Sequence, residues 1–316
     1  RDLHSFPTRR SSDLAKKRRE TDMDWGEIRD MLGLSITPDQ LRKQAVGYLE
    51  YDNYINGFEG VTTTILSISD LHYPFAKPLD TFKQYAGKID ILQLNGDLVD
   101  CMALSRFSKS YRVSPLEEMI GARQYIIDLI EMIKPKKVLA NHGNHELRLG
   151  SYLAKNLDNE LQELMPETAL DYIFNDGFTH YDRRTKAKIK YSPLREVFED
   201  IDIEYTGTWF SQYKGILFAH PKAFSSIPMK TVEKAMYWFR NEGYIFDCIT
   251  LAHTHRLGSY KIGHTMCYEQ GCCCETDKMR YTDGKLINSQ KEGYMIICLD
   301  KDGKIIDSKT KIISLN

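Results

Sequence analysis

The chain contains little glycine or proline and has no long apolar run. Its 316 residues include only 20 glycines and 10 prolines, too few for a collagenous or low-complexity protein. The longest apolar runs are short, such as Tyr294–Leu299, so we expect no membrane-spanning segment and no membrane partner. The chain also lacks an excess of one charge. Its 43 basic and 44 acidic residues give a net charge of −1, so the composition does not indicate a strongly basic nucleic-acid-binding protein.

The number of cysteines does not favour a disulfide-stabilised fold. Seven is an odd number, so the cysteines cannot all be paired, and a chain of this length does not need disulfides to fold. No stretch near the beginning combines a basic segment with an apolar one, as a secretory signal does. We therefore expect a reducing environment and a cytoplasmic protein.

Three of the cysteines, Cys272–Cys274, are consecutive, and Cys267 precedes them. Thiolates are good ligands for structural zinc, but consecutive side chains on an extended strand alternate in direction and cannot all face one ion. The spacing also lacks the repeated pairs that zinc-binding cysteines form. We predict that these cysteines are small residues of a buried strand.

The amino-terminal part divides into two segments. Residues 1–14 resemble a translated sequencing adapter and are left out of the fold prediction; if native, they would form a polar, disordered arm. Residues 15–58 are predicted to form a small helical unit. Asp24 can cap a helix that begins at Trp25, Gly33 ends it, and Thr37-Pro38 begins a second helix.

The helical unit has two interpretations. Helical spacing predicts that the first helix buries Trp25, Ile28, Met31 and Leu32, and that the second carries the apolar residues Leu41, Ala45 and Tyr48. Two helices joined by a short turn indicate either a helix-turn-helix unit or a helical hairpin docked on the main domain. Both interpretations stay open at this point.

From residue 59 to residue 316, short apolar runs alternate with helical stretches. This alternation predicts a layered α/β domain with a mixed sheet. The runs that indicate buried strands are Val61–Ser69, Ile89–Asn95, Lys137–Asn141, Gly215–His220 and Phe246–His253. Later strands are predicted near Ser259–Met266, Tyr294–Leu299 and Lys304–Ser308, and helices at Pro115–Ile133 and Pro228–Asn241.

Five polar motifs directly follow the apolar runs. They are Asp70-Leu-His72, Gly96-Asp97-Leu-Val-Asp100, Gly143-Asn144-His145-Glu146, His220 and His253-Thr-His255. The carboxyl ends of parallel strands are where α/β sheets bind ligands, so we expect these motifs to meet. Aspartate, histidine and asparagine offer oxygen and imidazole donors, which suit manganese, iron or zinc. Strand alternation predicts that Asp70 and His72 point to the same side and can share one ion, and the same geometry applies to His253 and His255.

In this order, the motifs resemble the signature of the calcineurin-like metallophosphoesterases. The resemblance extends over most of residues 61–300 and implies a β-sandwich of mixed sheets flanked by helices. It also implies two divalent metal ions, for which we expect manganese, with iron and zinc as alternatives. Carried over by position, it implies Asp70, His72 and His255 as ligands of the first ion, Asn144, His220 and His253 as ligands of the second, and Asp97 as the bridging carboxylate.

The resemblance further implies the residues that take part in proton transfer. His145 corresponds to the general acid of the family, and Asp100 to the carboxylate that orients it, with Glu146 as the other candidate. One departure is visible. The family usually has glycine before the last His-x-His motif, whereas this chain has Ala252, which leads us to expect a slightly displaced backbone with metal binding retained.

The substrate class is less closely defined. Protein phosphatases of this superfamily have Arg-Gly where this chain has Cys101-Met102, so a protein phosphatase is disfavoured; Arg106 or Arg148 could replace the missing arginine. The basic, tyrosine-flanked run His180–Tyr191 indicates either contact with a nucleic-acid backbone or an edge hairpin protected by its lysines.

We expect metal-dependent hydrolysis of a phosphate ester. A phosphodiesterase or nuclease acting on DNA or RNA is the first choice. The alternatives are a phosphomonoesterase acting on a nucleotide or other small ester, and a catalytically silent binding protein. An inactive relative is expected to have lost a ligand or the acid, whereas all seven ligand positions and His145 are filled here. The sequence sets no oligomeric state.

Overall fold

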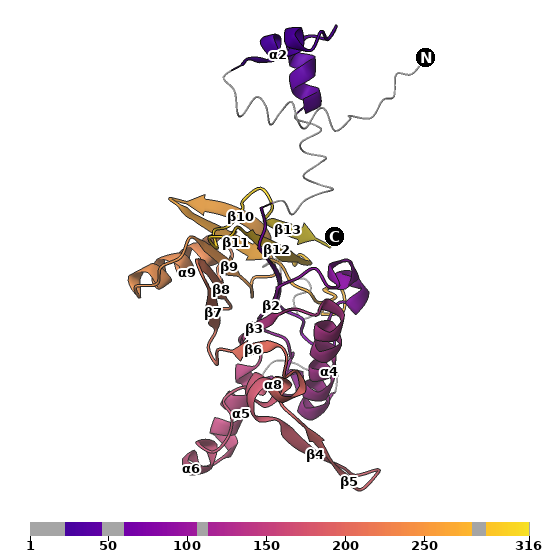
Figure 1. Cartoon of the computed structure of the whole chain (residues 1–316). Coiled ribbons are helices and arrows are strands. Elements are labelled where there is room, and N and C mark those ends of the chain that lie inside the picture. Colours follow the sequence, from indigo (N-terminus) through magenta and orange to yellow (C-terminus); the bar gives the residue numbers. More distant parts are fainter. Residues whose placement is uncertain (1–22, 46–59, 106–112, 280–288, 316) are drawn as a thin grey trace. The chain divides into compact units, whose positions relative to one another are not determined.

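The computed structural model describes residues 23–45, 60–105, 113–279 and 289–315 (Figure 1). The chain divides into two compact units, Arg1–Val61 and Thr62–Asn316. None of the helices among the described residues is long and apolar enough to cross a membrane.

The first unit contains the two predicted helices. Helix α2 (Trp25–Met31) follows Asp24, whose Oδ1 accepts a hydrogen bond from Glu27 N at 2.9 Å. In return, Glu27 Oε2 accepts one from Asp24 N at 2.8 Å, which completes a capping box. Gly33 follows the helix at φ +62°, and residues 38–45 form the second helix, so both predicted boundaries are confirmed.

The buried face of this unit is smaller than predicted. Ile28, Leu41 and Ala45 are buried, but Met31 and Leu32 are 50% and 41% exposed. Leu32 already belongs to the turn, so helical spacing does not carry it to the buried face. The predicted contribution of Tyr48 lies outside the described residues. A helix-turn-helix unit and a helical hairpin both stay predictions.

The second unit contains a six-stranded mixed sheet of order β13-β12-β1-β2-β3-β6. Strands β1, β2, β3 and β6 are parallel, and β12 and β13 add an antiparallel edge. The carboxyl ends of the parallel strands therefore lie at one edge of the sheet. The strands are β1 (Thr63–Ile68), β2 (Ile91–Asn95), β3 (Lys137–Asn141), β6 (Asp202–Tyr205), β12 (Gly293–Leu299) and β13 (Lys311–Ser314).

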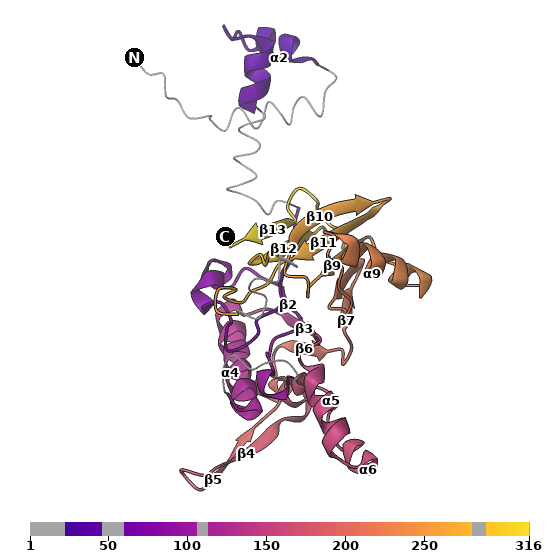
Figure 2. The same cartoon turned by 180° about the vertical axis from the view of Figure 1, so that it is seen from behind.

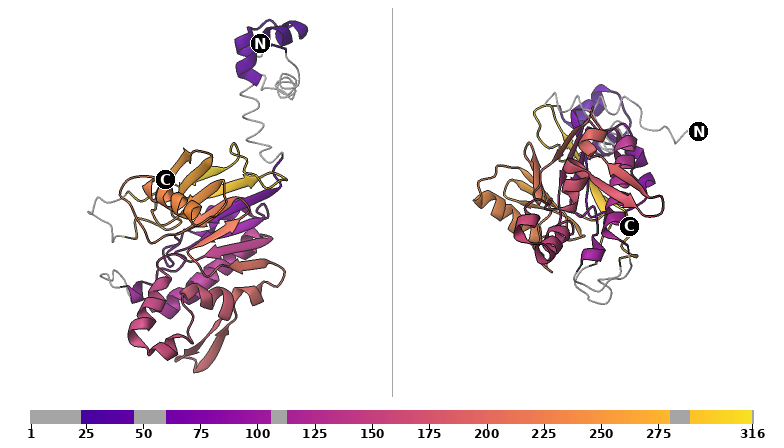
Figure 3. Two further views of the ribbon diagram at one scale, coloured as in Figure 1. Left: turned by 90° about the vertical axis from the view of Figure 1, so that its left-hand side faces the viewer. Right: turned by 90° about the horizontal axis from the view of Figure 1, so that it is seen from below.

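A five-stranded sheet of order β10-β11-β9-β8-β7 forms the other layer. Its strands are β7 (Phe210–Tyr213), β8 (Ile216–Ala219), β9 (Cys248–Leu251), β10 (Leu257–Ile262) and β11 (Thr265–Gln270). Strands β8, β9 and β11 are parallel, so the segments after β8 and β9 leave the sheet at one edge. The strands of the two sheets are seen as neighbouring layers in Figure 3.

Apolar side chains from both sheets form one core, and a second core lies under a helix. Ile65 and Leu139 of the first sheet pack with Phe218 and Cys248 of the second. Helix α9 (Lys230–Asn241) packs Val232 and Phe239 against the five-stranded sheet, in a cluster that includes Leu217 and Ile249. Helix α4 (Pro115–Ile133), capped by Ser114, buries Ile126, Ile130 and Ile133 of one face. Helices α9 and α4 lie on opposite sides of the paired sheets (Figures 1 and 2).

The remaining elements surround this framework. The basic run folds as a two-stranded hairpin, β4 (Phe178–Asp182) and β5 (Ala187–Tyr191), which is a separate sheet and not an edge of a larger one. The short helices are η1 (Leu79–Tyr85), η2 (Met102–Leu104), α5 (Leu147–Asn156), α6 (Asn159–Gln162), α7 (Ala169–Asp171), η3 (Tyr172–Asp176) and α8 (Leu194–Val197).

The layered α/β fold of mixed sheets flanked by helices is confirmed, as are the five predicted buried strands. Two later predictions are wrong. The run Ser259–Met266 is broken by a turn at Gly263, φ +58°, which separates β10 from β11. In Lys304–Ser308 only Ile305 makes an isolated bridge, to Leu299, and the last strand is β13.

Candidate metal centre

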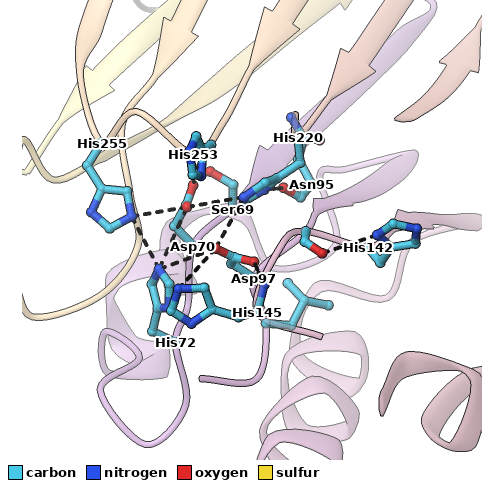
Figure 4. Close-up of polar contacts among 12 residues, drawn as sticks. Ser69, Asp70, His72, Asn95, Asp97, His142, His145, His220, His253 and His255 are labelled. Carbon is cyan, nitrogen blue, oxygen red and sulfur yellow. Dashed lines mark hydrogen bonds and ion pairs between the residues drawn. The ribbon is translucent and has the colours of Figure 1, made fainter. Parts of the chain in front are cut away.

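The predicted site residues gather where five strands end, at one edge of the two sheets (Figure 4). Segments after β1, β2 and β3 supply residues from one sheet, and segments after β8 and β9 supply them from the other. Seven of these side chains are buried, and Asn144 and His253 are partly exposed. The structure thus brings together all nine: Asp70, His72, Asp97, Asp100, Asn144, His145, His220, His253 and His255.

Asp70, His72 and His255 form a first donor cluster. The Nε2 atom of His255 lies 3.1 Å from Asp70 Oδ1 and 3.2 Å from His72 Nε2. His72 Nε2 is 3.7 Å from Asp70 Oδ1, and the three donor atoms lie within 4.8 Å of one another. One carboxylate oxygen and two imidazole nitrogens at these distances can hold one divalent transition-metal ion.

Asp97, His220 and His253 form a second donor cluster within the same 4.8 Å limit. His220 Nε2 lies 3.2 Å from Asp97 Oδ2 but makes no hydrogen bond. Asn144 Oδ1 is likewise buried without a hydrogen-bond partner among the described residues. A buried polar atom without a partner costs free energy, so both orphaned atoms fit a cation that they would coordinate.

Asp97 lies between the two clusters. Its Oδ2 is 3.2 Å from His220 Nε2 in the second cluster and 3.8 Å from His72 Nε2 in the first. Its Oδ1 accepts a hydrogen bond from the backbone N of His145 at 2.8 Å, which fixes the carboxylate plane. An oxygen that faces donors of both clusters is positioned to bridge two ions.

His145 is oriented by Asp100. The Nδ1 atom of His145 lies 2.8 Å from Asp100 Oδ1, and its Nε2 lies 3.8 Å from Asp97 Oδ2. Asp100 Oδ1 also lies 3.2 Å from Nδ1 of His72. The same carboxylate therefore orients both a candidate metal ligand, His72, and the candidate acid, His145. Contact with a carboxylate at Nδ1 leaves the Nε2 edge of His145 directed at the centre.

Glu146, the other candidate for orienting His145, has a different role. Its carboxylate accepts hydrogen bonds from four backbone N–H groups, those of Asp97, Leu98, Val99 and Gly143, at 2.6–3.1 Å. Burial and the neighbouring Asp97 carboxylate raise the pKa of Glu146 to about 7. Glu146 therefore connects the loops after β2 and β3 through backbone hydrogen bonds and does not orient the His145 ring.

Arg148 lies at the rim of the centre. Its Nη2 is 2.9 Å from His145 Nε2, and its Nη1 donates to the backbone O of Asp100 at 2.7 Å. Of the two arginines considered as phosphate ligands, Arg148 is thus beside the candidate acid, and Arg106 lies outside the described residues.

The backbone that presents the ligands is strained. Asp70, His72, Asp97, His253 and His255 all have positive φ, between 44° and 76°, a region that costs non-glycine residues about 1 kcal/mol or more each. Strand β1 ends at Ile68 and β9 at Leu251, so the X-x-His pairs lie beyond their strands. The prediction that strand alternation aligns each pair is therefore wrong; left-handed turns orient these side chains.

Glycine is required at two points of this framework. Gly96 has φ +75°, and a Cβ there would lie 2.7 Å from His220 Nδ1. A Cβ at Gly143 would lie 2.1 Å from Asp97 Oδ1. In contrast, Ala252 occupies the usual glycine position without a positive φ, and its N donates to Ala219 O at 3.0 Å.

Electrostatics at the centre favour bound positive charge. Burial raises the pKa of Asp70, but His255 and His220 outweigh it and hold the pKa below its usual range. Burial lowers the pKa of His72, but hydrogen bonds to Asp100 and Asp70 raise it to about 9. Burial likewise lowers the pKa of His220, but the Asp97 and Asp70 carboxylates outweigh this effect and raise it to about 9. Buried carboxylates that stabilise protons on neighbouring imidazoles can equally stabilise metal cations there.

The cysteine run Cys272–Cys274 lies beside His255 of the first donor cluster. Cys272–Cys274 are buried, as predicted, but they follow β11 and form isolated bridges instead of a strand. The thiols of Cys272 and Cys274 lie within 4.8 Å of each other and of a ring nitrogen of His255. The two outer side chains of the run thus face one side, as the alternation of side chains along an extended segment predicts.

Cavities flank the centre on its open side. One of about 520 Å³ includes His220 in its lining, and one of about 470 Å³ includes Asn144 and Arg148. A third, of about 660 Å³, extends along α5 and α6. All three share Leu147 and Lys222 in their linings. No motif surrounds Lys222 or the aromatic residues of the first cavity, so the sequence alone does not identify them as site residues.

A family model described as calcineurin-like phosphoesterase matches residues 63–257. A search of curated proteins finds no match. Similar solved structures include Vacuolar Protein Sorting 29 from Cryptosporidium parvum, with 15% identity, TM-score 0.39 and coverage of 81% of this chain and 99% of that one. Vps29 from Chaetomium thermophilum has 12% identity, TM-score 0.38 and coverage of 80% and 98%. An archaeal phosphodiesterase has 14% identity, TM-score 0.34 and coverage of 80% and 100%.

The matched span contains both donor clusters and all nine predicted site residues. It also covers more than half of the chain, so the family assignment depends on this match and not on the distant structural likenesses. The chain belongs to the calcineurin-like phosphoesterase family.

Proposed function

We propose that this chain is a dinuclear metal-dependent phosphodiesterase that cleaves nucleic acid. The observation that supports it most is the pair of donor clusters joined by Asp97, with Asn144 Oδ1 and His220 Nε2 both buried and without a hydrogen bond to any described residue. Membership of the phosphoesterase family independently suggests hydrolysis of a phosphate ester.

The two ion positions follow from the clusters. Asp70, His72 and His255 would hold the first ion, and His220 and His253 the second, with Asp97 shared. Asn144, whose Oδ1 is buried without a hydrogen-bond partner in the described part of the chain, would be a further ligand of the second ion. Divalent ions bound there supply Lewis acidity toward phosphoryl oxygens and lower the pKa of water toward neutrality. The mixed oxygen and imidazole donors suit manganese, with iron or zinc as alternatives.

His145 is the proposed general acid for the leaving oxygen. Asp100 fixes its ring through Nδ1, so Nε2 is the atom that presents the proton. Burial lowers the pKa of His145 below its usual range, against the opposing effect of the neighbouring Asp97 carboxylate. Arg148, now 2.9 Å from Nε2, is positioned to turn toward a bound phosphoryl group.

The surroundings of the centre support a polymeric substrate. The adjoining cavities are lined by Lys222, Arg148, Lys155 and Lys234. Cations spaced along connected hollows can contact successive phosphates of a strand. The lysines of β5, all exposed, and the predicted helix-turn-helix unit are further candidate contacts. A phosphomonoesterase acting on a small ester is the alternative.

Hydrolysis assays separate these functions. The manganese-loaded protein should hydrolyse bis(p-nitrophenyl) phosphate faster than p-nitrophenyl phosphate and should cleave single-stranded DNA or RNA. Preference for the monoester, with intact polynucleotides, would favour the phosphomonoesterase. Failure to hydrolyse any ester with two ions bound would favour the silent binding protein.

Variants of His145 test its role. His145→Ala should lower kcat by about 10²–10⁴-fold while leaving the metal content unchanged, because the residue donates a proton and holds no ion. His264→Ala, an exposed histidine in the β10–β11 turn, is the matched control and should retain full activity. Loss of metal from His145→Ala would make this residue a ligand instead.

A further inference from the structure

An aromatic cavity adjoins the second donor cluster. The cavity of about 520 Å³ shares His220 with that cluster and falls within the usual ~300–1,000 Å³ of small-molecule sites. Its walls come from four separate segments: the stretch from His142 to Leu147 after β3, Trp209 before β7, His220 with the residues that follow it, and α9. Their aromatic members are Trp209, Phe224 and Trp238.

The aromatic rings offer large unburied faces. Trp238 is 44% exposed and Phe224 is 42% exposed, although both line a hollow. Trp238 packs against two rings, with its ring centroid 5.3 Å from that of Trp209 and 5.0 Å from that of the buried Phe239. A tryptophan supported from behind by packed rings presents a flat, ordered surface to the cavity.

The wall opposite α9 is also held in position. Arg256 donates from Nη1 to Ser225 O at 3.0 Å and from Nη2 to Ser226 O at 2.9 Å. Its guanidinium carbon lies 5.2 Å from the centroid of the Phe224 ring. Ser225 N donates to Thr231 Oγ1 at 3.0 Å, which joins this segment to α9. The cavity is thus preformed in the free protein.

Charge at the cavity indicates what kind of molecule occupies it. Lys222 and Lys234 are exposed lysines in an otherwise mostly apolar lining. Lys222 also lines the second cavity, beside Asn144 and Arg148. The occupant therefore combines a flat apolar group with negative charge on the side of the metal centre, which describes a nucleotide.

We propose that this cavity binds the nucleobase of the nucleotide whose phosphate lies at the metal centre. This inference depends on the proposed function and specifies its substrate: the base stacks on Trp238, and Lys222 and Lys234 contact flanking phosphates. Stacking against an aromatic face accepts any base, so the cavity provides affinity for nucleotides without strict sequence preference.

Two esters with the same leaving group test the proposal in the manganese-loaded protein. Thymidine 5′-(p-nitrophenyl phosphate) carries a base, and methyl p-nitrophenyl phosphate does not. The wild type should have the higher kcat/KM with the thymidine ester. In Trp238→Ala the ratio of the two kcat/KM values should fall by about 5- to 150-fold, the range expected for one lost base–aromatic contact.

Control variants separate stacking from folding. Tyr237→Ala removes a neighbouring aromatic residue of α9 that is 50% exposed and does not line the cavity, so the ratio should not change. Trp238→Phe should restore part of the preference. Phe224→Ala on the opposite wall provides a second test if Trp238→Ala folds poorly. An unchanged ratio in both Trp238→Ala and Phe224→Ala would overturn the proposal.

Tryptophan fluorescence gives a readout that does not depend on activity. Thymidine 5′-phosphate should quench the wild type saturably, deoxyribose 5-phosphate should not, and Trp238→Ala should lose the effect. If the wild type hydrolyses neither ester but this quenching is observed, the proposed function fails while the base pocket stands. Quenching by octyl phosphate and not by thymidine 5′-phosphate would assign the cavity to an alkyl chain and overturn the base assignment.

Discussion

Gly143→Ala should disable the metal centre through one methyl group. A Cβ at this position would lie 2.1 Å from Asp97 Oδ1 and 2.6 Å from Asp97 N. Ordinary carbon–oxygen contacts are about 3.3 Å or longer, so Asp97 and the loop at 143 must separate by about 1 Å. Because Asp97 faces both donor clusters, this displacement disturbs both ion positions at once. A misplacement of about 1 Å can cost roughly 100-fold in rate.

The assay combines kinetics with metal analysis. Gly143→Ala should lower kcat/KM for bis(p-nitrophenyl) phosphate by about 100-fold and should reduce bound manganese measured by mass spectrometry. Gly215→Ala is the control, because its Cβ would lie 3.1 Å from the flexible end of the Asp247 side chain, in the turn between β7 and β8. Wild-type activity and metal content in Gly143→Ala would refute the reasoning.

Three further predictions concern the ligands and their support. Glu146→Gln should lower the free energy of unfolding by about 1–3 kcal/mol in urea denaturation, because the side chain accepts four backbone hydrogen bonds and the amide has only one acceptor atom; unchanged stability would contradict this role. The Asn144→Ala variant should bind one manganese ion, whereas Asp97→Ala should bind none. Loss of the same number of ions from both variants would show that the two ions are not held separately. In metal-free protein the pKa values of His72 and His220 are raised to about 9. This shift stabilises the fold fully when the pH is below about 6.5, which is the pKa of histidine in the unfolded chain. That stability is lost as the pH rises toward 9, so urea midpoints should fall from pH 6.5 to 9, and a rise would contradict the assigned carboxylate contacts.

The fold could be predicted where strands are continuous apolar runs. Strands β1, β2 and β3 are buried on both faces, so their sequences distinguish them clearly from their surroundings. Strands β6 and β7 have four residues each and mixed burial. The sequence of β6 alternates, but over too few residues to distinguish a strand, and that of β7 has neither a continuous nor an alternating apolar pattern. The place of β6 depends on its pairing with β3, which is distant in the sequence, and that of β7 on its pairing with β8, which follows it directly. The local sequence pattern reveals neither pairing.

The site could be predicted as a set of residues but not in its local geometry. Each motif follows a strand, and parallel strands bring their ends together, which explains why nine residues from position 70 to position 255 meet. The positive φ of Asp70 and His253 could not be read from the sequence, because non-glycine residues rarely adopt it. Likewise, Trp209, Phe224 and Trp238 carry no shared motif, and only tertiary packing places them beside His220.

Anomalous diffraction from crystals of the manganese-loaded protein tests the central claim most directly. We expect two manganese peaks about 3.5–4 Å apart, one beside Asp70 and His255 and one beside Asn144 and His220, with Asp97 in contact with both. A single peak, or peaks away from these side chains at saturating manganese, would contradict it.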